Sequence, residues 1–154
     1  MIPSPLIDWA VWANLDRHPD MELILLKGHL LLEIVLTDSL RRQTSLTVSQ
    51  IKNLSFHAKT QVLARTDAHL SDTMAHAKQL NRLRNQVAHE PFVQALEAEL
   101  ASWSEQVLAV YAIQKHQRYT RRTRLTQAIA ALARSVYESA YDRDSHASHG
   151  PTIT

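Results

Sequence analysis

A cluster of polar side chains lies just before Pro91, and its residue types suit chemistry on a phosphodiester. The cluster contains Arg82, Arg84, Asn85 and His89. An arginine guanidinium is planar and stays charged, so it can bind two phosphate oxygens at once. A histidine can take up or release a proton near neutral pH, and an asparagine can orient that histidine or hold a ribose or phosphate oxygen.

Such a set of side chains could cleave RNA without a metal ion, because the neighbouring 2′-hydroxyl can act as the nucleophile. A base removes the hydroxyl proton, an acid protonates the leaving 5′-oxygen, and an arginine stabilises the pentavalent phosphate. The alternative is structural, since arginine and histidine commonly satisfy the last carbonyls of a helix. On spacing alone, the structural arrangement is the more common one.

Helical geometry separates the two arginines of this cluster. At about 100° per residue, Arg82, Asn85 and His89 share one face of a helix, whereas Arg84 points about 140° away from His89. Arg84 and His89 can therefore meet at one ligand only if the helix unwinds near its end or if two chains contribute. The spacing by itself does not choose between Arg82 and Arg84.

The composition predicts an all-α fold. The chain has 154 residues, is 45% hydrophobic and contains only two glycines, which disfavours sheets with tight hairpins. Residues 1–141 are predicted to form one up-down bundle of about five helices, with residues 1–18 as an N-terminal helical extension and residues 142–154 as a disordered tail. The expected helices after this extension cover about 20–42, 47–64, 71–90, 91–118 and 121–141.

Apolar periodicity indicates how three of these helices are placed. Helix 20–42 is apolar all round and is expected at the centre of the bundle. Helix 47–64 and helix 71–90 each carry one apolar line. The lines consist of Val48, Ile51, Leu54, Ala58 and Val62, and of Ala77, Leu80, Leu83 and Val87.

A basic segment follows the polar cluster. No acidic residue occurs from Gln106 to Tyr137. The residues that could bind RNA there are Lys115, Arg118, Arg121, Arg122 and Arg124, with Tyr119 as a platform for base stacking. The alternative is an ordinary solvated helix face that is balanced by acids elsewhere in the fold.

Several classes of site are not expected. The chain has no cysteine, hence no disulfide, thiolate nucleophile or cysteine zinc site, and its histidines fit no metal-binding spacing, so we expect neither metal nor cofactor. There is no signal-peptide pattern, and Lys27, His29 and Glu33 interrupt the most apolar region. We therefore expect a cytoplasmic protein outside the membrane. Glu33, in an apolar helix, is expected either to pair with Arg82 or Arg84 or to assist the site.

The segment "LNRLRNQVAHE" resembles the signature of the HEPN superfamily, in which an arginine is followed after four to six residues by a histidine. The asparagine after the arginine and the alanine before the histidine match a frequent form of it. Upstream, "LLKGHLLLEIVLTDSL" and "LSFHAKTQVL" resemble the first two core helices of the mannitol-repressor-like branch. The resemblance covers about residues 20–118.

This resemblance implies an all-α dimer in which the motifs of two subunits meet at a shared cleft. Many members are metal-independent ribonucleases of toxin–antitoxin or phage-defence systems. Carried over, Arg84 matches the motif arginine, Asn85 the polar residue after it and His89 the histidine, with Glu33 as a helper. The expected partners are RNA, a second copy of the chain, and an antitoxin or regulatory protein.

The sequence also departs from the family pattern. Several nuclease subgroups carry a tyrosine two residues beyond the histidine, where this chain has Pro91. Members of the mannitol-repressor-like branch resemble regulators that act through partner proteins. The alternative function is therefore a non-catalytic regulator or interaction module on the same fold. A third hypothesis is an RNA-binding protein that uses the Lys115–Arg124 segment without cleaving RNA.

Overall fold

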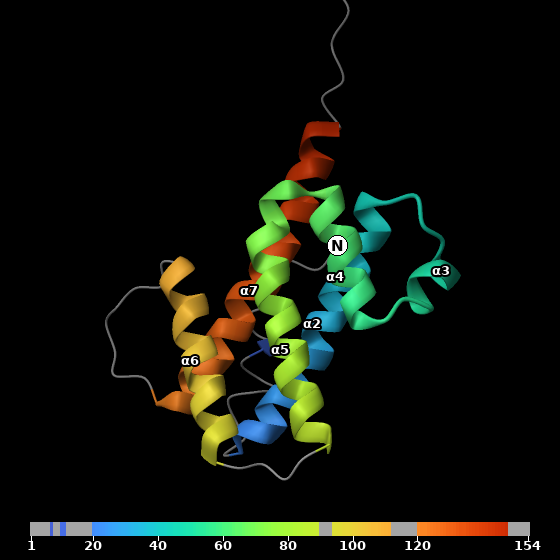
Figure 1. Ribbon diagram of the computed structural model, residues 1–154. Helices are drawn as coiled ribbons and strands as arrows, with labels where there is room; N and C mark the ends of the chain where they lie inside the picture. Colours follow the sequence, from blue (N-terminus) through green and yellow to red (C-terminus); the bar gives the residue numbers. More distant parts are fainter. Residues whose placement is uncertain (1–6, 8–9, 12–19, 90–93, 112–119, 148–154) are drawn as a thin grey trace, which may run out of the picture.

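The computed structural model describes residues 7, 10–11, 20–89, 94–111 and 120–147, with side chains as far as residue 143. Within this part of the chain every regular element is helical (Figure 1). The elements are α2 (Met21–Gln43), α3 (Val48–Lys52), α4 (Phe56–Thr66), the 3₁₀ helix η1 (Ala68–Leu70), α5 (Ser71–His89), α6 (Gln94–Val110) and α7 (Arg121–Ala147). The expected all-α class is confirmed.

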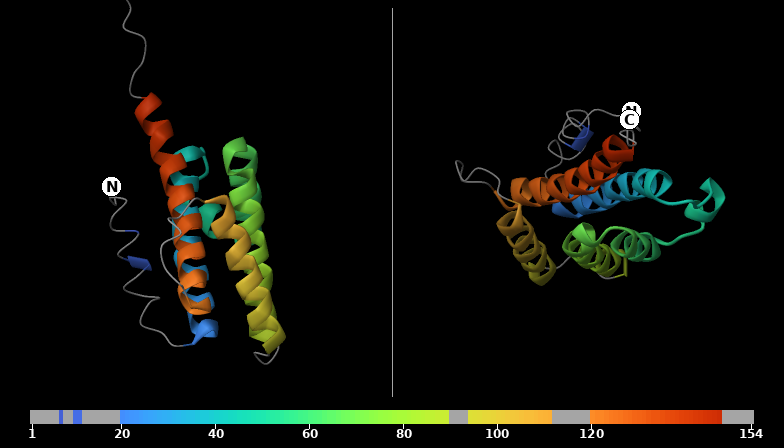
Figure 2. Two further views of the ribbon diagram at one scale, coloured as in Figure 1. Left: turned by 90° about the vertical axis from the view of Figure 1, so that its left-hand side faces the viewer. Right: turned by 90° about the horizontal axis from the view of Figure 1, so that it is seen from above.

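Helices α2 and α7 form the long central pair of the bundle, side by side along most of their length (Figure 2). The inner face of α2 buries large residues such as Leu32 and Leu36, while α7 contributes many small ones, including Ala128 and Ala133. Small side chains let the two helix axes approach closely. The two helices pack tightly at Gly28, where an added Cβ would clash with the side chain of Ile129.

The remaining helices complete the core around this pair. Helices α4 and α5 form a hairpin through η1, and α5 also packs against α6. The indole of Trp103 on α6 donates a hydrogen bond of 3.1 Å to the carbonyl of His76 on α5. This arrangement fixes α5 between α4 and α6, and leaves its outward face open.

The prediction of one helix over residues 47–64 is wrong. The chain forms α3 and α4 instead, with a break between them at residues 53–55. Thr47 and Gln50 form a capping box at the start of α3, and the hydroxyl of Ser55 accepts from the backbone N–H of Ala58 at the start of α4. These two caps start separate helices, although the apolar periodicity continues across the break. Val48, which was expected on the buried line, is 53% exposed.

The other helix bounds follow the expectations more closely. Helix α2 starts after the cap Asp20 and α5 ends at His89, and the apolar line from Ala77 to Val87 is buried as expected. Helix α7 continues to Ala147, so residues 142–147 are helical where we expected a disordered tail. Most of residues 1–18, and all of 148–154, lie outside the described residues.

Candidate functional site

The outward face of α5 forms one wall of an open groove with the start of α4. We call it the α4–α5 groove; its volume is about 530 Å³. It is lined by His57, Lys78, Asn81, Arg82, Asn85, Gln86 and His89. Each of these side chains is cationic, an imidazole or a carboxamide. None of the described lining residues is a carboxylate, and such a surface attracts anions.

The helix spacing placed three predicted site residues correctly relative to one another. Helix α5 stays regular to its end at His89. Arg82, Asn85 and His89 therefore lie together along the groove. The side chain of Arg82 also lies 3.6 Å from the carboxylate of Glu99 on α6, but both groups are largely exposed. Such an exposed pair is weak and leaves Arg82 able to contact a ligand.

Arg84 does not line this groove. It is half-buried, and its Nη1 donates a hydrogen bond of 3.2 Å to Oδ1 of Asn85. Its charge acts on His29 of α2, which places the guanidinium near the boundary between α5 and α2. Within one chain, Arg84 and His89 therefore face different directions, as the 140° separation predicts.

Glu33 has a different partner from the one expected. Its carboxylate lies 2.8 Å from Nζ of Lys59 on α4, so the pairing with Arg82 or Arg84 is not observed. The lysine is the buried member, with 7% of its side chain exposed, whereas Glu33 is 32% exposed. The pair fixes α2 to α4 beside the α4–α5 groove, since a buried ammonium needs a compensating charge.

His29 is a residue of this region that the sequence reasoning did not assign. Its imidazole is buried, stacks on Phe56 with ring centroids 4.2 Å apart, and forms a hydrogen bond of 2.9 Å from Nε2 to Oδ1 of Asn81. Burial lowers its pKa, the bond to Asn81 opposes this, and Arg84 lowers the pKa further. A histidine within the apolar helix 20–42 could have indicated a buried imidazole that needs a polar partner.

The basic segment is partly neutralised in the fold. Arg121 lies 3.5 Å from Glu97, and Arg124 lies 2.8 Å from Glu105, both on α6. Arg122 is half-buried. This agrees with the alternative that acids elsewhere balance the segment. The other expected RNA-binding residues, Lys115, Arg118 and Tyr119, lie outside the described residues.

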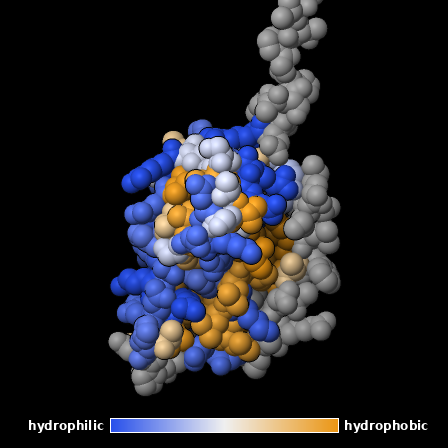
Figure 3. All heavy atoms as spheres, turned by 90° about the vertical axis from the view of Figure 1, so that its right-hand side faces the viewer, coloured by the Kyte–Doolittle hydropathy of each residue, from blue (hydrophilic) through white to orange (hydrophobic). Residues whose placement is uncertain are grey.

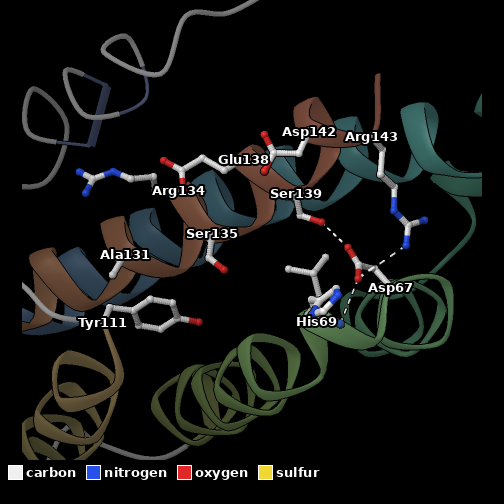
Figure 4. Close-up of a pocket in the computed structure, with 11 residues that line it drawn as sticks. Asp67, His69, Tyr111, Ala131, Arg134, Ser135, Glu138, Ser139, Asp142 and Arg143 are labelled. Atoms are coloured by element: carbon white, nitrogen blue, oxygen red, sulfur yellow. Dashed lines mark hydrogen bonds and ion pairs between the residues drawn. The ribbon is translucent and has the colours of Figure 1, made fainter. Parts of the chain in front are cut away.

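A second cavity, of about 650 Å³, lies between η1, the C-terminal half of α7 and Tyr111 (Figure 4). The carboxylate of Asp67 is buried there and accepts from the hydroxyl of Ser139 and from the backbone N–H of His69. Arg143 lies 3.6 Å from the same carboxylate and donates to the carbonyl of Thr66 at 3.0 Å. These bonds link the C-terminal part of α7 to η1. We call Asp67, Ser139 and Arg143 the Asp67 clasp.

The outer face of α2 carries an apolar strip (Figure 3). Leu30 is 58% exposed and Ile34 is 62% exposed, and Leu23 and Leu26 on the same face are half-buried. Neighbouring apolar side chains that are exposed on one helix face form a candidate contact surface. The strip lies beside Glu33 on the same helix.

No family model, curated protein or solved structure matches the chain. Among the described residues, no helix is sufficiently long and apolar to cross a membrane. In the same part of the chain, no three histidine, aspartate or glutamate side chains come together as a metal site would require.

Proposed function

We propose that this chain is a metal-independent endoribonuclease of HEPN type that binds RNA in the α4–α5 groove. The observation that carries the proposal is the lining of this groove, whose described residues are Lys78, Arg82, two imidazoles and three carboxamides. Phosphate oxygens are the natural partners of such a surface. Cationic side chains bind the backbone, and the carboxamides can hold ribose hydroxyls.

In this proposal the RNA supplies its own nucleophile. His89 exchanges a proton with the reacting oxygens, Arg84 stabilises the charge on the pentavalent phosphate, and Asn85 orients the ligand. Glu33 assists through His29, on which its charge and the charge of Arg84 both act. The products are a 2′,3′-cyclic phosphate and a 5′-hydroxyl. Arg82 and the basic residues Arg121, Arg122 and Arg124 extend the binding surface for the strand, together with Lys115, Arg118 and Tyr119.

Two chains are needed for Arg84 and His89 to act on one phosphate. The apolar strip on α2 supports a homodimer, because Leu30 and Ile34 would be removed from water at such an interface. The strip borders Glu33, and Glu33 and Arg84 both act on His29. A dimer formed there would thus place the Arg84 region at the boundary between the chains.

The biological setting proposed here follows from the resemblance in the sequence. An RNA-cleaving protein of this type acts in the cytoplasm as a toxin or in phage defence. An antitoxin or other regulatory protein would then keep its activity silent until it is needed.

The test is cleavage of a mixed RNA pool by purified protein in EDTA, with wild type beside Arg84→Ala and His89→Ala. We expect wild type to produce cyclic phosphate ends and each variant to lose at least ~100-fold in rate. Circular dichroism and thermal unfolding show whether the variants remain folded. As a matched control, His69→Ala changes an exposed histidine outside the groove and should cleave at the wild-type rate.

The alternative function is a non-catalytic regulator or interaction module. The observation that favours it is that Arg84 is already bonded to Asn85 within the same helix. In that case a folded wild type would not cleave RNA under any of these conditions, and the α2 strip would bind a regulatory protein instead. Salt-sensitive RNA binding without cleavage would indicate the third function, an RNA-binding protein.

A further inference from the structure

The α4–α5 groove contains two imidazoles from different helices. His57 is the second residue of α4 and is exposed, and His89 is the last residue of α5. Both line the same groove. The motif in the sequence accounts for His89 but assigns nothing to His57.

The contacts of the neighbouring residue place His57 along the groove. Phe56 stacks on His29, and His29 is hydrogen-bonded to Asn81 of α5. Because His57 directly follows Phe56, it reaches the groove near the level of Asn81. This position is toward the opposite end of the lined stretch of α5 from His89.

The distance along α5 suits a ligand held between the two histidines. From Asn81 to His89 the helix advances by about 12 Å, and Asn85 lies midway. Both imidazole side chains can extend along the groove toward this midpoint. A phosphate bound near Asn85 would therefore have His57 on one side and His89 on the other.

The charges around the groove are compatible with a phosphate at this place. Lys78 and Arg82 line it, and no described lining residue is acidic. On α2, the carboxylate of Glu33 is paired with Lys59. The positive side chains would bind the phosphate and leave proton transfer to the imidazoles.

We propose that His57 is the second acid–base residue of this groove, which rests on the proposed ribonuclease function. One histidine accepts the proton of the 2′-hydroxyl as the bond from the 2′-oxygen to phosphorus forms. The other donates a proton to the 5′-oxygen as its bond to phosphorus breaks. The cyclic product and the 5′-hydroxyl leave the two histidines with exchanged protonation states, which solvent restores.

The experiment is the pH profile of RNA cleavage in EDTA for wild type, His57→Ala, His57→Gln and the control His69→Ala. Two acid–base groups give a bell-shaped profile, and removal of one abolishes a limb of the bell. We expect both His57 variants to lose one limb and at least ~100-fold in rate, with the thermal unfolding midpoint unchanged. The control should keep the wild-type profile.

Two different failures can be told apart. An active wild type with a His57→Ala variant that keeps the rate and the complete bell would overturn the role of His57 and leave the ribonuclease proposal standing. A folded wild type that does not cleave RNA would overturn the ribonuclease proposal itself, and the role of His57 with it.

Discussion

His29 of α2 and Asn81 of α5 are joined by a hydrogen bond of 2.9 Å between Nε2 and Oδ1. The other ring nitrogen, Nδ1, is buried and has no hydrogen-bond partner. The proton is therefore best placed on Nε2, because Nδ1 is then a lone acceptor and not an unpaired donor. Burial lowers the pKa of His29, so the folded chain keeps the ring neutral.

This relationship predicts how stability depends on pH. Because the pKa of His29 lies below 6.5 in the folded chain, the unfolded chain binds the proton first as pH falls. The stabilisation from the neutral ring is complete at pH values above the unfolded-state pKa of about 6.5. It decreases as the pH falls toward the lower pKa of His29 in the folded chain. We expect the free energy of unfolding to fall between about pH 7 and pH 5, and to fall less in His29→Gln. Urea titrations across this range measure it, and equal slopes would contradict it.

The clasp at Asp67 is expected to contribute substantially to stability. Burial alone would raise the pKa of Asp67, but the Ser139 hydroxyl, the His69 backbone N–H and Arg143 together hold it below 3.8. Asp67→Ala leaves those donors unpaired and should cost about 1–3 kcal/mol at pH 7. The stabilisation is present above the unfolded-state pKa and is lost at lower pH, so wild type and variant should converge in acid.

Chemical denaturation at pH 7 and at about pH 3 tests this prediction for the clasp. The control is Glu138→Ala, an exposed change on the same stretch of α7, which should stay within about 0.5 kcal/mol of wild type. If Asp67→Ala behaves like this control at pH 7, the clasp does not stabilise the fold.

The close approach of α2 and α7 predicts coupling between Gly28 and Ile129. Alanine is favoured over glycine in a helix by about 1 kcal/mol, but an added Cβ would clash with Cδ1 of Ile129 and lie 3.3 Å from its Cγ2. We expect Gly28→Ala to destabilise the protein. Adding Ile129→Val removes Cδ1 and should relieve this clash.

A double-mutant cycle measures that relief. The two changes should be less destabilising together than the sum of each alone, by about 0.5–3 kcal/mol. Strictly additive values would mean that the helices separate easily at this point.

The apolar strip on α2 predicts the oligomeric state. Ile34→Lys places a charge on the strip and should convert a dimer to a monomer without loss of helical content, because a charge buried at the interface is costly. Light scattering coupled to size-exclusion chromatography reports the mass. Val110→Lys on α6 is the matched control, since Val110 is 58% exposed and lies outside the strip. A monomeric wild type would contradict the proposed interface.

The sequence predicted features that depend on neighbours along the chain. The face shared by Arg82, Asn85 and His89, the buried line of α5 and its end at His89 all follow from helical periodicity and from Pro91. The break before α4 was not predicted, because the apolar pattern continues across it, whereas the cap at Ser55 starts a new helix.

The side-chain contacts between different helices could not be predicted from the sequence. Glu33 and Lys59 are 26 residues apart, and His29 and Asn81 are 52 apart, so no local pattern joins them. In the sequence, each of these residues is a single polar position in a helix, and nothing near it in the chain indicates its partner. His57 likewise lines the groove because the α4–α5 hairpin brings the start of α4 beside the stretch of α5 around Asn81.

The pairing of α2 with α7 has a consequence for synthesis. The inner face of α2 is covered largely by the helix that leaves the ribosome last among the described elements. Until α7 emerges, Leu32 and Leu36 lack much of their native cover, and the outer strip of the same helix is also apolar. A nascent chain paused before α7 would therefore expose both sides of α2, a state that favours chaperone binding or aggregation over independent folding.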